Sequence, residues 1–170
     1  MLREKGYRSV TIEGIAETAG VGKQTIYRWW PSKAAVILEA FARDTAVRVP
    51  ASDTGNLQRD LKIFLVKAFE ILNRESGQIM RSLMSEALLD VQFAMTLREI
   101  FIDSRRHALR DILMRSIKRG KISPKVEIEL MIDLIYGPMW YRLLNKHAPL
   151  DKAFAHHLSK TITVFLRQVP

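Results

Sequence analysis

Apolar residues recur along this chain at every third or fourth position, the spacing that places them on one face of an α-helix. Near the start, Thr11 can cap a short helix that ends at Ala19. Gly20-Val21 then predicts a tight turn before a second short helix over about 22–29. Pro31-Ser32 ends that helix and opens a third. The start of the chain therefore predicts two short helices joined by a glycine turn, with a third helix behind them.

Longer periodic segments follow a loop over 49–56 that is rich in Pro, Ser, Asp, Thr and Gly. They predict amphipathic helices over about 57–72, 77–88, 91–119, 124–146 and 151–167. Gly120 suits the end of the third of these, and Pro138 should kink the fourth. We therefore expect an all-α protein, divided at the loop into domains 1–48 and 53–170.

Composition and charge narrow the class of protein. The chain has 170 residues, 27 Lys and Arg against 18 Asp and Glu, and a net charge of +9. Because 48% of its residues are hydrophobic, it is a folded basic protein with an anionic partner, and not a disordered polycation. It has no cysteine, which excludes disulfides, zinc-thiolate sites and a cysteine nucleophile.

Location follows from what the sequence lacks. No run of about eighteen apolar residues could span a bilayer, and residues 1–7 are charged where a signal peptide needs an apolar stretch. We expect a cytoplasmic protein with no membrane partner.

The glycine turn between two short helices is the helix-turn-helix arrangement, whose second helix enters the major groove of DNA. Lys23, Gln24 and Thr25 occupy the first turn of that helix and can address guanine, adenine and the thymine methyl group. Tyr27 is placed for a phosphate, whereas packing is the favoured role of Trp30. Ser32 and Lys33 open the third helix, whose N-terminus is a ready phosphate site.

The same stretch resembles the DNA-binding segment of the TetR family of bacterial one-component regulators. The residues that carry the resemblance are Lys5-Gly6-Tyr7, Thr11, Ile15-Ala16, Ala19-Gly20-Val21, Lys23, Thr25, Ile26-Tyr27-Arg28 and Pro31-Ser32-Lys33. Arg119-Gly120 and residues 135–144 also look like one subgroup of that family's ligand-binding domains. The resemblance implies a helix-turn-helix module followed by a helical bundle for ligand binding and dimerisation.

The resemblance also assigns roles. It implies that DNA is bound through Thr11, Lys23, Gln24, Thr25, Tyr27, Arg28, Ser32 and Lys33. Three departures accompany it. Only residues 1–5 of the family's long first helix remain, which implies a truncated chain or missing residues. Gly22 replaces a small hydroxyl residue that caps the recognition helix in the family. Gln24 replaces a common small residue.

Methionine and aromatic residues gather in the middle of the chain, where the family binds its effectors. Core packing is the favoured role of any single methionine, but together these residues suit an adaptable apolar cavity. The expected ligand-binding residues are Met80, Met84, Phe101, Tyr136, Met139 and Trp140. The arginines over 98–119 form mostly a solvated face; one of them could turn inward to pair with an acidic ligand group, and the sequence does not say which.

Dimerisation follows from the helix over 124–146, which is apolar on two faces and so must be covered on both sides. With the last helix it should form a two-fold, four-helix interface. The expected interface residues are Leu134, Tyr141, Phe154, Leu158, Ile162 and Phe165.

Other classes of protein fit less well. Neighbouring His156 and His157 point about 100° apart on a helix, so we expect no metal site. No catalytic or nucleotide-binding string such as H-E-x-x-H or G-x-S-x-G occurs, and we expect neither an enzyme nor a cofactor. The expected function is that of a ligand-responsive transcriptional regulator. It binds a palindromic DNA operator as a homodimer and represses until a small apolar or amphipathic effector releases it. The alternatives are a helical sequestering protein that no longer binds DNA, and an enzyme with a site in the cavity.

Overall fold

The computed structural model describes Tyr7 and residues 9–169, and every regular element in this part of the chain is a helix. The all-α prediction is confirmed. The expected remnant of a first helix over 1–5 lies outside the described residues. The helices are α2 (Ile12–Ala19), α3 (Lys23–Trp29), α4 (Lys33–Arg48), α5 (Leu57–Leu72), α6 (Glu75–Leu89), α7 (Val91–Leu97), η1 (Arg98–Ile102), α8 (Asp103–Lys118), α9 (Ile128–Asn145) and α10 (Lys152–Gln168).

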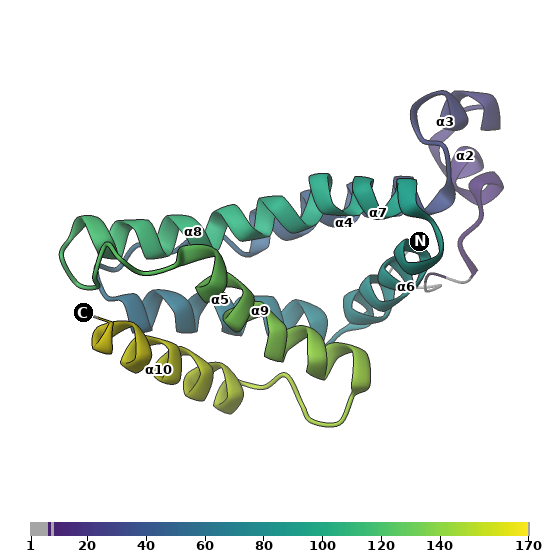
Figure 1. The fold of residues 1–170 in the computed structure, drawn as a ribbon. Coiled ribbons are helices and arrows are strands. Elements are labelled where there is room, and N and C mark those ends of the chain that lie inside the picture. The colour runs from purple at the N-terminus through teal and green to yellow at the C-terminus, as the bar shows by residue number, and fades with distance from the viewer. Residues whose placement is uncertain (1–6, 8, 170) are drawn as a thin grey trace.

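The two short helices begin and end at the residues that the sequence indicated. Thr11 is the N-cap of α2, and its Oγ1 accepts a hydrogen bond from the Gly14 amide at 3.1 Å. Gly20 ends α2 with φ +67°, the left-handed conformation that glycine adopts without strain. Gly22 caps α3 through its backbone only, so α3 starts without a side-chain cap. Together α2 and α3 project from one end of the molecule (Figure 1).

Helix α4 joins this projecting pair to the rest of the protein. Ile12, Ala16 and Ile26 form a small core of their own, and Val36 of α4 packs against it. Further along α4, Ile37, Leu38 and Phe41 belong to the large core of the bundle. Since α4 takes part in both cores, a movement of α4 within the bundle would move α2 and α3 with it.

The helix expected over 91–119 is interrupted by one wider turn. Helices α7 and α8 follow each other through η1, a π-helical turn over 98–102. A π turn inserts an extra residue, which rotates the faces of the helix on either side, and here Phe101 is buried. Gly120 ends the rod with φ +65°, in the place that the sequence predicted.

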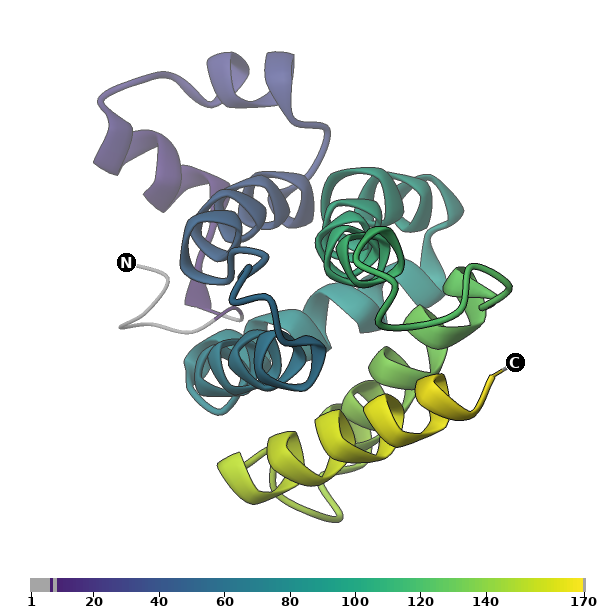
Figure 2. The same cartoon turned by 90° about the vertical axis from the view of Figure 1, so that its left-hand side faces the viewer.

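The last two helices correct two expectations. Helix α9 begins at Ile128 and not near 124, because the Val126 amide bonds the Ser123 carbonyl at 3.3 Å and closes a turn around Pro124. Helix α10 lies against α5 on the outside of the bundle (Figure 2). Within that contact Leu158 and Ile162 are buried. They therefore pack inside the subunit, and are not available for the dimer interface in which we expected them.

Among the described residues, no helix is both long and apolar enough to cross a membrane.

Candidate DNA interface and ligand cavity

Helix α3 presents a polar face outward. Ile26 is its buried residue, and it anchors the helix in the small core. Gln24, Thr25, Tyr27 and Arg28 are all exposed, with Gln24 and Arg28 opposite Ile26 and the other two on its flanks. The structure thus brings four of the expected DNA-binding residues together on one accessible helix that stands clear of the bundle (Figure 1). This placement is what a helix that enters the major groove requires.

Lys23, at the start of α3, is held by a carboxylate. Its Nζ lies 2.5 Å from Oε1 of Glu13 on α2, and both side chains are more than half exposed. The hydrogen bond from Lys23 lowers the pKa of Glu13. Because a carboxylate here both occupies Lys23 and repels phosphate, Glu13 should weaken DNA binding.

Substituting Glu13→Gln should therefore raise affinity for any duplex by roughly twofold to fivefold, the equivalent of a surface ion pair worth up to about 1 kcal/mol. Fluorescence anisotropy with a labelled duplex at low salt measures it. The control is Glu17→Gln, which removes the same charge from an exposed position on α2. An equal gain in both variants would show that net charge, and not the release of Lys23, is responsible.

The start of α4 is built differently from the simple phosphate site that we expected. Ser32 caps α4, and its Oγ accepts a bond from the Ala35 amide at 3.2 Å, which leaves the hydroxyl proton free to donate. The side chain of Lys33 is turned toward Tyr7. Its Nζ donates to the Tyr7 carbonyl at 3.3 Å and lies 4.6 Å from the centre of the Tyr7 ring. Lys33 must leave these contacts to reach a phosphate.

The two tryptophans at the end of α3 have different surroundings. Trp30 packs against the small core, and its Nε1 donates to Oε2 of Glu39 at 2.6 Å, so the packing role is confirmed. Trp29 is 70% exposed, beside Arg28. Sequence reasoning did not single out Trp29, although an exposed indole on a reading helix can contact DNA. Helical spacing gave no signal for this exposure, because Trp29 follows Ile26 by three residues and so lies only about 60° around the helix from that buried side chain.

A small cavity lies within the bundle between α4, α5, η1, α8 and α9, with a volume of about 40 Å³. Four of the expected ligand-binding residues line it: Phe101, Tyr136, Met139 and Trp140. The Tyr136 hydroxyl donates to the Arg105 carbonyl at 2.9 Å, and burial raises the pKa of Tyr136. Met80 and Met84 do not line this cavity. Met80 is fully buried in the core and Met84 packs against it, as the general tendency of methionine suggests.

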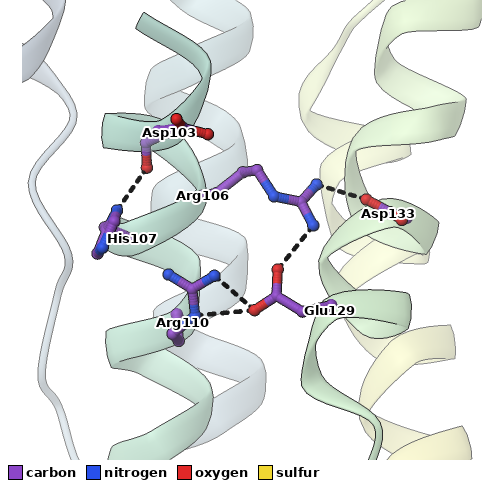
Figure 3. A network of polar contacts seen from close by, with 6 residues as sticks. All are labelled: Asp103, Arg106, His107, Arg110, Glu129 and Asp133. Atoms are coloured by element: carbon purple, nitrogen blue, oxygen red, sulfur yellow. Dashed lines mark hydrogen bonds and ion pairs between the residues drawn. The ribbon is translucent and has the colours of Figure 1, made fainter. Parts of the chain in front are cut away.

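Most arginines of the basic run form ion pairs. Arg106 bonds Asp133 and Glu129, and Arg110 donates to the same Glu129, so α8 is tied to the start of α9 (Figure 3). These contacts lower the pKa of the Glu129 carboxyl. Arg105 differs from these, because it turns toward the cavity and lines it.

Helices α9 and α10 both carry large apolar side chains that the rest of the described chain leaves exposed, and we call this set the exposed apolar face of α9 and α10. The exposed side chains are Leu130, Leu134, Tyr141 and Leu144 on α9, and Val164 and Phe165 on α10. Three of the expected interface residues, Leu134, Tyr141 and Phe165, lie on this face, and Phe154 is half-buried.

A helix-turn-helix carried by a helical bundle with an internal cavity is the architecture of a bacterial one-component regulator. Residues 1–40 match the family model described as bacterial regulatory proteins, tetR family, and residues 51–162 match the model described as tetracyclin repressor-like, C-terminal domain. The chain belongs to the TetR family.

Individual proteins agree with this assignment. The HTH-type transcriptional regulator YdeS of Bacillus subtilis is 38% identical over 93% of this chain and 80% of its own. The DNA-binding transcriptional repressor TetR of Mycobacteroides abscessus is 28% identical over 98% of this chain and 87% of its own. The crystal structure of the TetR family regulator SCO0332 superposes with a TM-score of 0.89, at 29% identity over 96% of this chain and 90% of its own. The protein is therefore a ligand-responsive, DNA-binding transcriptional regulator.

Proposed function

We propose that the protein is a homodimeric repressor that binds a palindromic operator and leaves it when a small apolar or amphipathic effector enters the bundle. The observation that carries this proposal is that α4 belongs to both cores: it lines the cavity with Phe41 and Thr45 and also supports α2 and α3. The repressor among its relatives supports the direction of control. Because operator DNA lies in the cytoplasm of a bacterium, the proposal includes a cytoplasmic location.

Release from the operator follows from thermodynamic linkage between effector binding and DNA binding. If the effector fits better when α4 holds the two reading heads at a spacing that the operator does not match, binding shifts the population away from the DNA-competent form. A hundredfold shift needs about 2.7 kcal/mol of differential affinity. Phe101, Tyr136, Met139 and Trp140 would contact the effector, because they already line the cavity.

Dimerisation would use the exposed apolar face of α9 and α10. An isologous contact between two such faces brings four helices together, and a stable interface of this kind buries about 2,000 Å² or more in total. Two-fold symmetry then places the two copies of α3 in successive major grooves, about 34 Å or somewhat more apart.

Base reading should depend on Gln24. Glutamine can pair bidentately with adenine, so Gln24→Ala should relax preference at one base pair of each half-site and lose roughly 1 to 3 kcal/mol of discrimination. Tyr27→Phe is the matched comparison, because loss of a phosphate contact should weaken binding to all sequences alike. Binding to a library of single-base operator variants measures both. A Gln24→Ala protein with unchanged base preferences would remove Gln24 from the reading set.

The whole proposal is tested by selecting genomic fragments with the full chain and repeating the selection with a panel of metabolites. We expect salt-dependent binding to a palindrome and its loss with one class of metabolite. Absence of salt-dependent DNA binding would favour the sequestering protein, and turnover of a bound metabolite would favour the enzyme.

A further inference from the structure

Arg105 is a charged residue set into the wall of the apolar cavity. Its Nη1 donates to the Thr45 carbonyl at 3.2 Å and to the Val49 carbonyl at 3.3 Å, at the C-terminal end of α4. Among the described residues, the acceptor of its Nη2 is Ser104 Oγ, at 3.4 Å. Burial lowers the pKa of this guanidinium.

The neighbouring arginines are compensated. Arg106 and Arg110 bond the carboxylates of α9, and Arg115 and Arg119 approach Asp53. Among the described residues, no carboxylate lies within ion-pair distance of Arg105. A guanidinium has five N–H donors, so Arg105 keeps donors for a further acceptor.

Arg105 also stands between two hollows. The cavity of about 40 Å³ lies on one side, and a larger hollow of about 270 Å³ lies on the other. The two share four wall residues, which are Phe101, Arg105, Tyr136 and Trp140. Phe101 lies on the π turn, and Trp140 is only half-buried. A rotation of Trp140 would join the hollows around the guanidinium.

We propose that the effector is a small aromatic monocarboxylate whose carboxylate binds the Arg105 guanidinium while its ring lies among Phe101, Tyr136 and Trp140. This rests on the proposed function and names the class of effector. Carboxylate and guanidinium match in geometry and form charge-assisted hydrogen bonds. The three aromatic side chains favour a planar apolar body.

The charged residues that line the two hollows favour a ligand with one negative charge. The open hollow is also lined by Arg106 and Asp133, which already bond each other. Arg105 is therefore the one cation of these two linings, within the described residues, that is not already paired with a carboxylate. A dianionic phosphate would leave one negative charge uncompensated beside Asp133, at a high cost in a partly buried site.

The contact between the ligand carboxylate and Arg105 would also explain how the ligand releases the protein from operator DNA. Arg105 now fixes the C-terminal end of α4 through two backbone carbonyls. A carboxylate that takes over the guanidinium competes with these neutral acceptors, and charge-assisted bonds are stronger. Ligand binding would thus loosen the end of α4, the helix that supports α2 and α3.

Titration calorimetry on the full chain tests the class of ligand. The probes are 1-naphthoate, cinnamate and benzoate, each paired with its neutral amide. We expect at least one acid to bind about tenfold to hundredfold more tightly than its amide, the usual value of a hydrogen bond to a charged group. Amides that bind as tightly as the acids, or acids that do not bind, would overturn the proposal.

Variants then locate the contact. Arg105→Gln should remove the preference for acid over amide, and Arg105→Lys, which keeps the charge but not the fork of donors, should keep part of it. Arg98→Gln is the control, because it removes the same charge from an exposed position on η1. If Arg105→Gln keeps the full preference, or Arg98→Gln loses it, the carboxylate binds elsewhere.

Operator binding separates this proposal from the proposed function. Arg105→Gln should bind the operator more weakly than wild type without ligand, and acids should no longer release it. If amides release wild-type protein as well as acids do, the carboxylate proposal fails while the ligand-responsive repressor stands. If the wild type binds no operator, the repressor fails, and calorimetry still decides the ligand class.

Discussion

A Phe165→Asp protein should be a folded monomer that has lost operator binding. Phe165 is 47% exposed on the apolar face of α9 and α10, so an aspartate there is solvated in the free subunit. In a dimer the same carboxylate would be buried against the partner without a counter-ion, which costs several kcal/mol. A single reading head then loses the gain from binding two half-sites together. Sedimentation velocity measures assembly, and gel shift with the selected operator measures binding.

Two comparison variants make the result specific. His156→Asp places the same charge on an exposed site about half a turn around α10 from Phe165 and should leave the dimer intact. Ile162→Asp should unfold the subunit, because Ile162 is only 6% exposed and packs inside the bundle. A wild-type protein that sediments as a monomer at micromolar concentration, or a Phe165→Asp dimer, would contradict the proposed interface.

The apolar stripe of α10 shows a limit of prediction from helical periodicity. Periodicity placed Leu158, Ile162 and Phe165 on one side of a helix, and it did so because all three are apolar at helical spacing. It could not say which part of that stripe the subunit covers itself. Helix α10 packs on α5, and Leu158 and Ile162 are buried within the subunit, whereas Phe165 stays exposed.

Local signals predicted the DNA-binding end well. Thr11, Gly20 and Ser32 act through neighbours three or four residues away, so their caps and turns can be derived from the sequence alone. Lys33 and Arg105 depend on partners that are distant in the chain, Tyr7 and the end of α4. Only the fold shows which long cation turns inward, because the same residue type is favourable on a solvated face.

Gly77→Ala should destabilise the protein by about 3 kcal/mol, the upper part of the range for overpacking a core. Gly77 is buried in the first turns of α6, just after α5 ends. A Cβ there would lie 1.9 Å from the Leu72 carbonyl oxygen and 3.4 Å from Cδ1 of Leu143. The nearer contact is with backbone, so the turn between α5 and α6 must shift.

Thermal unfolding followed by circular dichroism measures this loss, which should lower Tm by roughly 6 to 12 °C for a chain of this size. Gly22→Ala is the matched control: its φ is −74° and a Cβ there meets nothing within 4 Å, so it should change stability by less than about 1 kcal/mol. The strain that Gly77→Ala introduces would lie between α5 and α6, so it would also displace α6 from its contacts with α4 and α9. A Gly77→Ala protein with wild-type Tm would mean that this turn relaxes freely, and that the α5–α6 junction does not fix the bundle.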